Sequence, residues 1–404
     1  MQVQKCKGCK DMLPADMAQF RRVELLFREA CLQSGYAEVR TPTLENLYLF
    51  TAAGTLTPGM LRRVYSFLDW DGWSGERVVL KPDATIPAAR LYLEQLTREK
   101  PSRLFYVTNT FVFEETGSKA RERWQCGAEL IGAGKPMGDA DLVALALTAL
   151  GKLGLKGISI RLSHAGLIRA ALAGLGISTE EQHTIFDRIL DLGAEALTDI
   201  KTANPQGLET MKLLCDTRGE SSGYLKNLRA LVTDAAPDYR AALDDFISSF
   251  ELIEALGAPC RVDMTAGKGF EYYTGLIFRL YAGEDNIGGG GRYDQLVSVL
   301  GGEETPAAGF ALYIDRLMAH LPEGEVLPLC VAVTCRPEEF KAGAGLILAL
   351  REAGISARLA LGEVVPSTWT VEVGAAGAFT VTNKKGEKTV CDSISGVKTW
   401  LQQD

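Results

Sequence analysis

A long segment, residues 165–256, carries repeated helical patterns and almost no strand signal, and it constrains the fold more than any other feature. Stretches such as HTIFDRILDLGAEAL and YRAALDDFISSFELIEALG space their apolar side chains about 3–4 residues apart, as an amphipathic helix does. Short β-type runs lie on both sides of the segment, at 77–80, 103–107, 157–162, 260–264 and 271–282. The pattern predicts an α+β core of strands and helices that is interrupted by a helical insertion.

Helices are also expected in the core. Residues 17–34 have the periodicity of an amphipathic helix with Gly35 directly after it, and residues 86–96 and 139–154 are helical in pattern. The glycine run 288–291 is different, because it lacks the fingerprint of a P-loop or of a dinucleotide-binding turn. Taken alone, this run predicts a flexible turn that opens a short helix.

The chain is long enough for more than one domain. Its 404 residues exceed the roughly 100–200 residues of a typical domain. Residues 319–328 contain two prolines and few periodic apolar positions, which indicates a linker, and a small α/β pattern follows. We expect a core at 1–164 and 257–318, the insertion at 165–256, the linker at 319–328 and a C-terminal domain at 329–404.

Composition and charge exclude several classes of protein. The sequence is 47% apolar and 23% charged, as soluble globular proteins are, and no apolar run approaches a membrane span. The formal net charge of −8 gives no general attraction to nucleic acid. The nine cysteines are scattered and do not suggest a disulfide framework, and the N-terminus has no signal-like stretch. We expect a cytoplasmic protein that binds neither membranes nor tRNA.

Metal and cofactor sites are not expected. Cys6 and Cys9 have metal-like spacing, but no second CxxC or histidine pair completes four ligands. With only His164, His183 and His320 present, a histidine-based metal site or catalytic triad is hard to assemble. His164 follows a strand pattern, and we expect it to cap a helix or to satisfy a buried hydrogen bond.

Several short segments, widely separated but in a fixed order, form one larger pattern. They are GCKDMLP at 8–14, GYAEVRTP at 35–42, KPDAT at 81–85, NTFVFE at 109–114, QCGAELIG at 125–132, GFEYYTG at 269–275, GGRYD at 290–294 and AGFALYIDR at 308–316. Together they resemble the motifs of histidyl-tRNA synthetase, a class II synthetase. They resemble more closely those of its non-catalytic paralogue, the regulatory subunit of ATP phosphoribosyltransferase. The resemblance covers nearly the whole chain.

The resemblance implies a fold and an assembly. It implies a class II antiparallel sheet flanked by helices, in which 290–294 and 308–316 belong to a glycine-rich strand and to the third class II motif. The segment 35–42 resembles the dimer-forming first motif, so the chain is expected to dimerise through its core. Residues 329–404 resemble a shortened anticodon-binding domain.

The resemblance also implies an amino-acid pocket of the histidine type. Asp83 and Thr85 would take an ammonium group, Gln125 a carboxylate or an amine, and Glu129 with Tyr272 or Tyr273 an imidazole. Without the resemblance, a glutamate in this strand pattern is more simply a solvent-facing side chain. The two tyrosines would then be ordinary core aromatics.

The departures from the synthetase motifs concern the ATP side. The resemblance places an arginine where this chain has Val112, a basic residue at Glu115 and an arginine at Lys268, which is grouped with the pocket. Valine offers neither charge nor hydrogen bond to a phosphate. Glu114 and Arg316 are the expected residual nucleotide contacts. We therefore expect no catalytic residues.

Three functions follow from these observations. The first is a regulatory subunit that binds histidine and the short catalytic form of ATP phosphoribosyltransferase, for activation and feedback inhibition. The second is a divergent histidyl-tRNA synthetase, which pyrophosphate exchange with histidine would reveal. The third is a paralogue that activates another amino acid.

Overall fold

The computed structural model describes most of the chain. The described residues are 4–53, 64–70, 75–98, 100–113, 119–216, 219–232, 236–267, 272–322, 330–362, 369–383 and 385–401. The chain divides into two compact units, Met1–Asp11 with Gln19–Pro322 and Met12–Ala18 with Glu323–Asp404.

A mixed sheet forms the centre of the first unit. Its eight strands among the described residues run in the order β1-β5-β6-β11-β10-β9-β7-β8. They are β1 Ala37–Glu38, β5 Ser102–Phe111, β6 Glu122–Ile131, β7 Ile158–His164, β8 Cys260–Val262, β9 Leu276–Ala282, β10 Asp285–Arg292 and β11 Ala307–Tyr313. The pairs β1–β5 and β7–β8 are parallel and the others are antiparallel. The expected α+β class is confirmed.

One face of this sheet is apolar and covered by helices. The helix α1, Pro14–Gln33, contributes Phe27, whose ring lies 6.1 Å from Phe105 and 6.4 Å from Phe310. The helix α5, Met137–Lys152, also packs against β6 and β11. The helix predicted at 17–34 is thus confirmed, and Gly35 follows it with a φ of 77°, a conformation that favours glycine. The opposite face of the sheet carries the candidate site.

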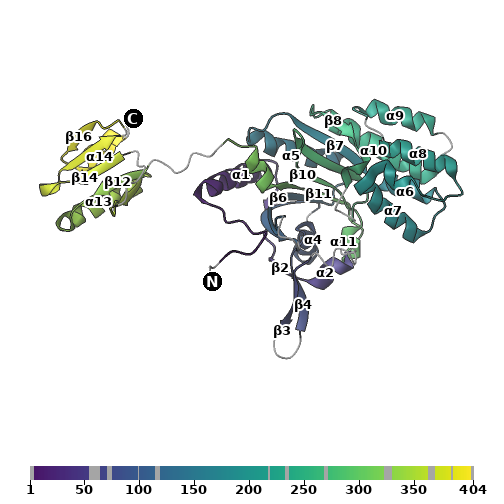
Figure 1. Cartoon of the computed structure of the whole chain (residues 1–404), viewed down its shortest axis with the longest axis horizontal. Helices are drawn as coiled ribbons and strands as arrows, with labels where there is room; N and C mark the ends of the chain where they lie inside the picture. The colour runs from purple at the N-terminus through teal and green to yellow at the C-terminus, as the bar shows by residue number, and fades with distance from the viewer. Residues whose placement is uncertain are drawn as a thin grey trace. The chain divides into compact units, whose positions relative to one another are not determined.

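The insertion consists of helices beside the β7–β8 end of the sheet (Figure 1). They are α6 Ala165–Ala173, α7 Thr179–Leu192, α8 Pro205–Asp216, α9 Ser222–Leu231 and α10 Pro237–Glu254. His164 caps α6, since its Nδ1 accepts from the Leu167 N–H at 3.0 Å, and its Nε2 lies 3.0 Å from Asp245 on α10. The expectation that His164 caps a helix and satisfies a buried bond is confirmed.

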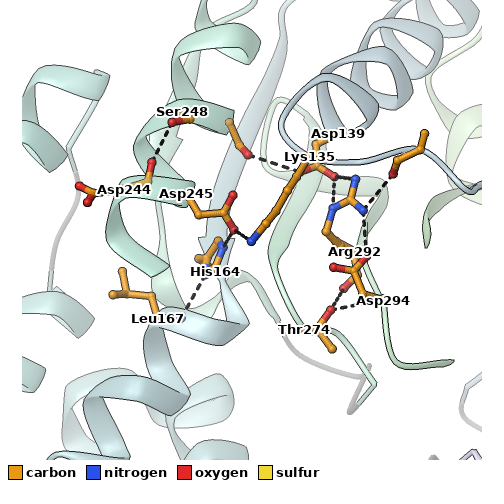
Figure 2. A network of polar contacts seen from close by, with 12 residues as sticks. Lys135, Asp139, His164, Leu167, Asp244, Asp245, Ser248, Thr274, Arg292 and Asp294 are labelled. Carbon is orange, nitrogen blue, oxygen red and sulfur yellow. Dashed lines mark hydrogen bonds and ion pairs between the residues drawn. The ribbon is translucent and has the colours of Figure 1, made fainter. Parts of the chain in front are cut away.

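A polar network joins the insertion to the core (Figure 2). Lys135 lies 2.6 Å from the Asp245 carboxylate that also faces His164. Nearby, the buried guanidinium of Arg292 binds Asp139 of α5 through Nε at 2.8 Å and Nη2 at 2.7 Å. Ser249 of α10 donates to the same Asp139 at 3.3 Å. The two ion-paired groups therefore hold α10, α5 and β10 together.

The glycine run lies inside β10 and is not a turn that opens a helix. β10 is hydrogen-bonded on both sides, to β9 and to β11, and the short helix α11, Leu296–Val299, begins only after Gln295. A Cβ on Gly290 would come within 2.1 Å of the Gly309 carbonyl oxygen. The glycines are needed for close strand packing, so the turn prediction was wrong, and the glycine-rich strand implied by the resemblance is confirmed.

The remaining elements of this unit are short helices, helical turns and strands. They are β2 Leu44–Asn46, α2 Leu47–Ala52, β3 Ser66–Trp70, β4 Gly75–Leu80, α4 Thr85–Leu91, η1 Tyr92–Leu96, η2 Gly193–Leu197, η3 Met264–Gly267 and α12 Ile314–Ala319. The strands β2, β4 and β3 form a small separate sheet. The helix predicted at 86–96 is observed as α4 followed by the π-helical turn η1.

The second unit is a small α/β fold. Its described strands run in the order β13-β12-β14-β15-β16, with α13 and α14 packed on the sheet. The described strands, helices and helical turns of this unit are β12 Cys330–Thr334, η4 Pro337–Glu339, α13 Phe340–Glu352, β13 Ser356–Leu359, β14 Trp369–Val373, η5 Ala375–Gly377, β15 Phe379–Asn383, β16 Lys388–Cys391 and α14 Ile394–Leu401. The lysine-rich segment after β15 turns back at Asn383, whose N–H donates to Glu387 O at 3.1 Å.

The structure also bears on membrane spans, metal sites and cysteines. Within the described ranges, no helix is long and apolar enough to cross a membrane. The same residues contain no group of three or more side chains that could hold a metal ion. All nine cysteines carry free thiols, and four of them are buried, namely Cys31, Cys126, Cys215 and Cys260.

Candidate functional site

A buried carboxyl group, that of Glu129, occupies the centre of the site face. Glu129 lies on β6 with no exposed surface. Its Oε1 accepts from the Tyr106 hydroxyl at 2.8 Å, and its Oε2 accepts a short hydrogen bond from the Tyr293 hydroxyl. Tyr106 comes from β5 and Tyr293 follows β10, so three separate strands hold one carboxyl group. The solvent-facing interpretation of Glu129 is therefore wrong.

Glycines on the sheet make room for these side chains. A Cβ on Gly309 would lie 1.7 Å from the Glu129 Oε2, and one on Gly127 would lie 2.4 Å from the Tyr106 ring. Gly309 is directly opposite Glu129 in the β6–β11 register, and Gly127 is directly opposite Tyr106 in the β5–β6 register. Since directly opposite residues share a face, each large side chain lies flat over a neighbouring glycine.

The loop before α4 brings a second acid to the same place. The Asp83 Oδ1 accepts from the Ile86 N–H at 2.9 Å at the start of α4, and its Oδ2 accepts from the Tyr272 hydroxyl at 3.4 Å. The Thr85 hydroxyl lies close to Glu129, Tyr106 and Tyr272 and lowers the pKa of each of these groups. We call Asp83, Thr85, Tyr106, Glu129, Tyr272 and Tyr293 together the Glu129 cluster.

The electrostatics of the cluster favour a protonated acid. Burial raises the pKa of Glu129 to about 8, although hydrogen bonds from Tyr293, Tyr106 and Thr85 oppose the shift. Burial also raises the pKa of Asp83 above its ordinary value. Behind the loop, burial lowers the pKa of Lys81 to about 8, and its Nζ donates to the carbonyl and hydroxyl oxygens of Thr41 at 3.3 Å.

This arrangement suits a ligand that carries a nitrogen heterocycle. At neutral pH a carboxylic acid with a pKa near 8 carries a proton that it can donate to a ring nitrogen. The tyrosine hydroxyls fix the orientation of that acid group. A ligand without ring nitrogens would leave the buried polar groups without a partner, which costs binding energy.

The remaining residues predicted for the pocket lie as follows. Gln125 is four residues before Glu129 on β6, so strand alternation puts both on the same face. The buried ring of Tyr273 contacts that of Tyr272, with centroids 5.3 Å apart. The Arg316 Nη1 donates to the Asn286 carbonyl oxygen, and the guanidinium lies 5.1 Å from the ring centroid of Tyr313. Lys268, Glu114 and Glu115 lie outside the described residues.

Sequence reasoning missed Tyr106, Tyr293 and Lys81. Tyr293 and Lys81 stand inside motifs that were noticed, GGRYD and KPDAT, but each was read only as part of its motif. Tyr106 lies within a β-type run, where a tyrosine is unremarkable. The only available signal was Gly127, a glycine inside a strand pattern, which often marks a close approach by another group.

Replacing Gly309 by alanine tests the close packing of the cluster. We expect a loss of about 1–3 kcal/mol in the free energy of unfolding, because the new Cβ would overlap the Glu129 carboxyl group. Urea unfolding measures the change. Gly151→Ala is the matched control: this exposed glycine of α5 has nothing within 4 Å of an added Cβ. Equal stability of the two variants would contradict the packing described here.

The chain is similar to known proteins over most of its length. The family model for histidyl-tRNA synthetase matches residues 8–317. A protein of Dehalococcoides mccartyi named ATP phosphoribosyltransferase regulatory subunit is 46% identical, over 96% of this chain and 95% of that protein. The histidine–tRNA ligase of Methanocaldococcus jannaschii is 32% identical over 80% of this chain and 77% of the ligase.

A solved structure has the same fold. The Bacillus halodurans protein described as an ATP phosphoribosyltransferase regulatory subunit/histidyl-tRNA synthetase superposes with a TM-score of 0.77 and is 25% identical. The match covers 91% of this chain and 95% of that one. The chain belongs to the histidyl-tRNA synthetase family, in its branch of ATP phosphoribosyltransferase regulatory subunits.

Proposed function

We propose that this chain is a non-catalytic regulatory subunit of ATP phosphoribosyltransferase in histidine biosynthesis. It binds histidine in the Glu129 cluster and associates with a separate, short catalytic subunit, which it activates and makes sensitive to feedback inhibition. The observation that carries the proposal is the 46% identity, over nearly the full length of both chains, to a protein named as such a subunit.

The cluster supports histidine as the effector. An imidazole has two nitrogens, one of which accepts a hydrogen bond in the neutral ring while the other donates one. A protonated Glu129 can donate to the accepting nitrogen, and a tyrosine oxygen can accept from the other. The ammonium group of the ligand would lie near Asp83 and Thr85, where a second acid stands within hydrogen-bonding reach of Tyr272.

The residue at position 112 supports a non-catalytic role. The Val112 N–H donates to the Arg121 carbonyl oxygen at 2.9 Å, which continues the β5–β6 pairing. Strand alternation from Tyr106 then puts Val112 on the site face. At that position a valine cannot contribute the charge-assisted hydrogen bonds that phosphate transfer needs.

The assembly is part of the proposal. Dimerisation would use the core segment 35–42, and the catalytic subunit would bind a surface of that dimer. A cytoplasmic location and the absence of tRNA binding complete the proposal, and the net charge of −8 supports the latter.

Mixing this chain with the short catalytic subunit tests the proposal. Phosphoribosyl transfer to ATP is expected to be slow for the catalytic subunit alone, faster with this chain, and inhibited when histidine is added. The control is the same mixture with the Gly309→Ala variant, which should lose inhibition because its pocket is disturbed. Failure of this chain to change either the rate or the histidine response would refute the proposal.

A divergent histidyl-tRNA synthetase is the second candidate, favoured by the 32% identity to an archaeal histidine–tRNA ligase. We expect no histidine-dependent exchange of pyrophosphate into ATP, since Val112 cannot bind a phosphate. A synthetase assayed alongside provides the positive control. Exchange above background would favour this second candidate. A thermal-shift screen of amino acids addresses the third, a paralogue that activates a different amino acid.

A further inference from the structure

Arg279 is a half-buried arginine on β9 that shares its face of the sheet with the Glu129 cluster. The register sets Arg279 opposite Gly289 of β10, Gly289 opposite Ala311 of β11, and Ala311 opposite Gly127 of β6. Directly opposite residues carry their side chains on the same face. Arg279 therefore stands at one end of a row of small residues that crosses the sheet to Tyr106.

The side chain of Arg279 extends along this row. A Cβ on Gly289 would come within 2.8 Å of the Arg279 Cδ, so the stem of the arginine lies over that glycine. Its Nη1 donates to the Tyr313 hydroxyl at 3.4 Å. Tyr313 is directly opposite Gln125 in the β6–β11 register. The guanidinium therefore lies on the Gln125 side of the site.

The site face thus has an acidic side and a cationic side. Asp83 and Glu129 form the acidic side, and Arg279 lies across Gly289 and Ala311 from them. The row of Glu129 and Gly309 is adjacent to the row of Gly127 and Ala311, about 7 Å away along the strands. Because the stem of Arg279 extends over Gly289 toward these rows, its guanidinium can face the carboxylate of a ligand whose ring lies at Glu129.

We propose that Arg279 binds the carboxylate of the amino-acid ligand whose ring is held by the Glu129 cluster. The inference rests on the proposed function, because it takes the cluster as the place where histidine binds. A planar guanidinium binds a carboxylate through two parallel N–H donors, which gives both strength and orientation. Arg279 then determines specificity: it selects an amino acid over an analogue that has the same ring and amine but no carboxylate.

The test compares two ligands and two proteins by calorimetry. The ligands are L-histidine and histidinol, in which a hydroxymethyl group replaces the carboxylate, and the proteins are the full-length chain and its Arg279→Gln variant. We expect the unchanged chain to bind histidine about 10- to 100-fold more tightly than histidinol, the range of a charge-assisted hydrogen bond. Arg279→Gln should lose this preference by weakening histidine binding alone, and Arg279→Lys should restore part of it.

A matched control is Arg161→Gln. Arg161 is opposite Arg279 on the neighbouring strand β7, and its guanidinium forms ion pairs with Asp263 and Glu284 and lies 3.8 Å from the Tyr281 ring centroid. This variant should keep the preference for histidine. If Arg279→Gln binds both ligands as the unchanged chain does, or loses both equally, the inference is overturned and histidine binding stands. If the unchanged chain binds no histidine, the proposed function fails and the inference fails with it.

Discussion

Replacing Asp139 by alanine is expected to lower the free energy of unfolding by about 3–5 kcal/mol, because the variant leaves the charge of Arg292 buried without its main partner. Arg292 is 1% exposed and Asp139 3% exposed, and Nε and Nη2 of Arg292 both bind the same carboxylate. A second acid, Asp294, binds Nη1 at 2.8 Å but is itself partly exposed. It therefore offsets only part of the loss.

Urea unfolding of the full chain measures this effect, and two further variants separate its causes. Ser249→Ala removes one hydrogen bond of 3.3 Å to the same carboxylate and should cost at most about 1.5 kcal/mol. The double variant Asp139→Leu with Arg292→Met removes both charges and should recover most of the stability lost in the single variant. If Asp139→Ala costs no more than Ser249→Ala, the pair is not the anchor that Figure 2 suggests.

Local sequence patterns were enough to predict the longer helices and parts of the strands β5, β7 and β9, but not the ten-residue strand β6. The helix α1 and the helical insertion have apolar residues at helical spacing, β7 alternates apolar and polar residues, and β5 contains an apolar run. Hydrophobic periodicity could not predict the strand at the glycine run 288–291, because glycine has no side chain to show an apolar and polar alternation. Its strand is specified by neighbours on both sides, and only the motif resemblance carried that information.

The short elements were missed for a different reason. The strands β13 and β16 span four residues each, which is too few for a pattern to stand out from loop sequence. The strand expected at 271–282 begins only at Leu276, because Thr274 has already turned to pair with Arg292 through its N–H at 2.7 Å. Tertiary hydrogen bonds set that boundary.

The candidate site could be predicted only in part. Motif resemblance selected Asp83, Thr85, Glu129 and Tyr272, which the structure brings together. The partners of Glu129 are 23 residues away at Tyr106 and 164 residues away at Tyr293. A glycine such as Gly127 indicates a close approach in the sequence but does not identify the residue that approaches. The role of Arg279 likewise follows only from the strand register.

Histidine binding is expected to be strongest between about pH 6.5 and pH 8, and the pKa values of the two partners set these limits. The complex shares one proton between Glu129 and the imidazole. In this range the free protein already carries that proton on Glu129, whose pKa is about 8, so binding neither takes up nor releases one. Above pH 8 binding must take up a proton, and below about pH 6.5 free histidine must release one. Affinity should therefore fall about tenfold per pH unit on either side.

Glu129→Gln tests the high-pH limit. The amide cannot titrate, so we expect weaker binding at pH 7, by about 10-fold or more, and no further decline between pH 8 and pH 9. Glu122→Gln is the control, since Glu122 also lies on β6 but alternation puts it on the other face, where it accepts from Asn109 at 2.8 Å. That variant should keep the full pH profile. An unchanged profile in Glu129→Gln would exclude Glu129 as the shared proton site.

The same proton also links stability to pH. Because the folded state holds a proton on Glu129 up to about pH 8, whereas the unfolded chain releases it near pH 4.5, stability from this group falls as pH rises between these values. The slope is about 1.4 kcal/mol per pH unit for one proton. Glu129→Gln should remove this slope, which urea unfolding at pH 5 and pH 8 would measure.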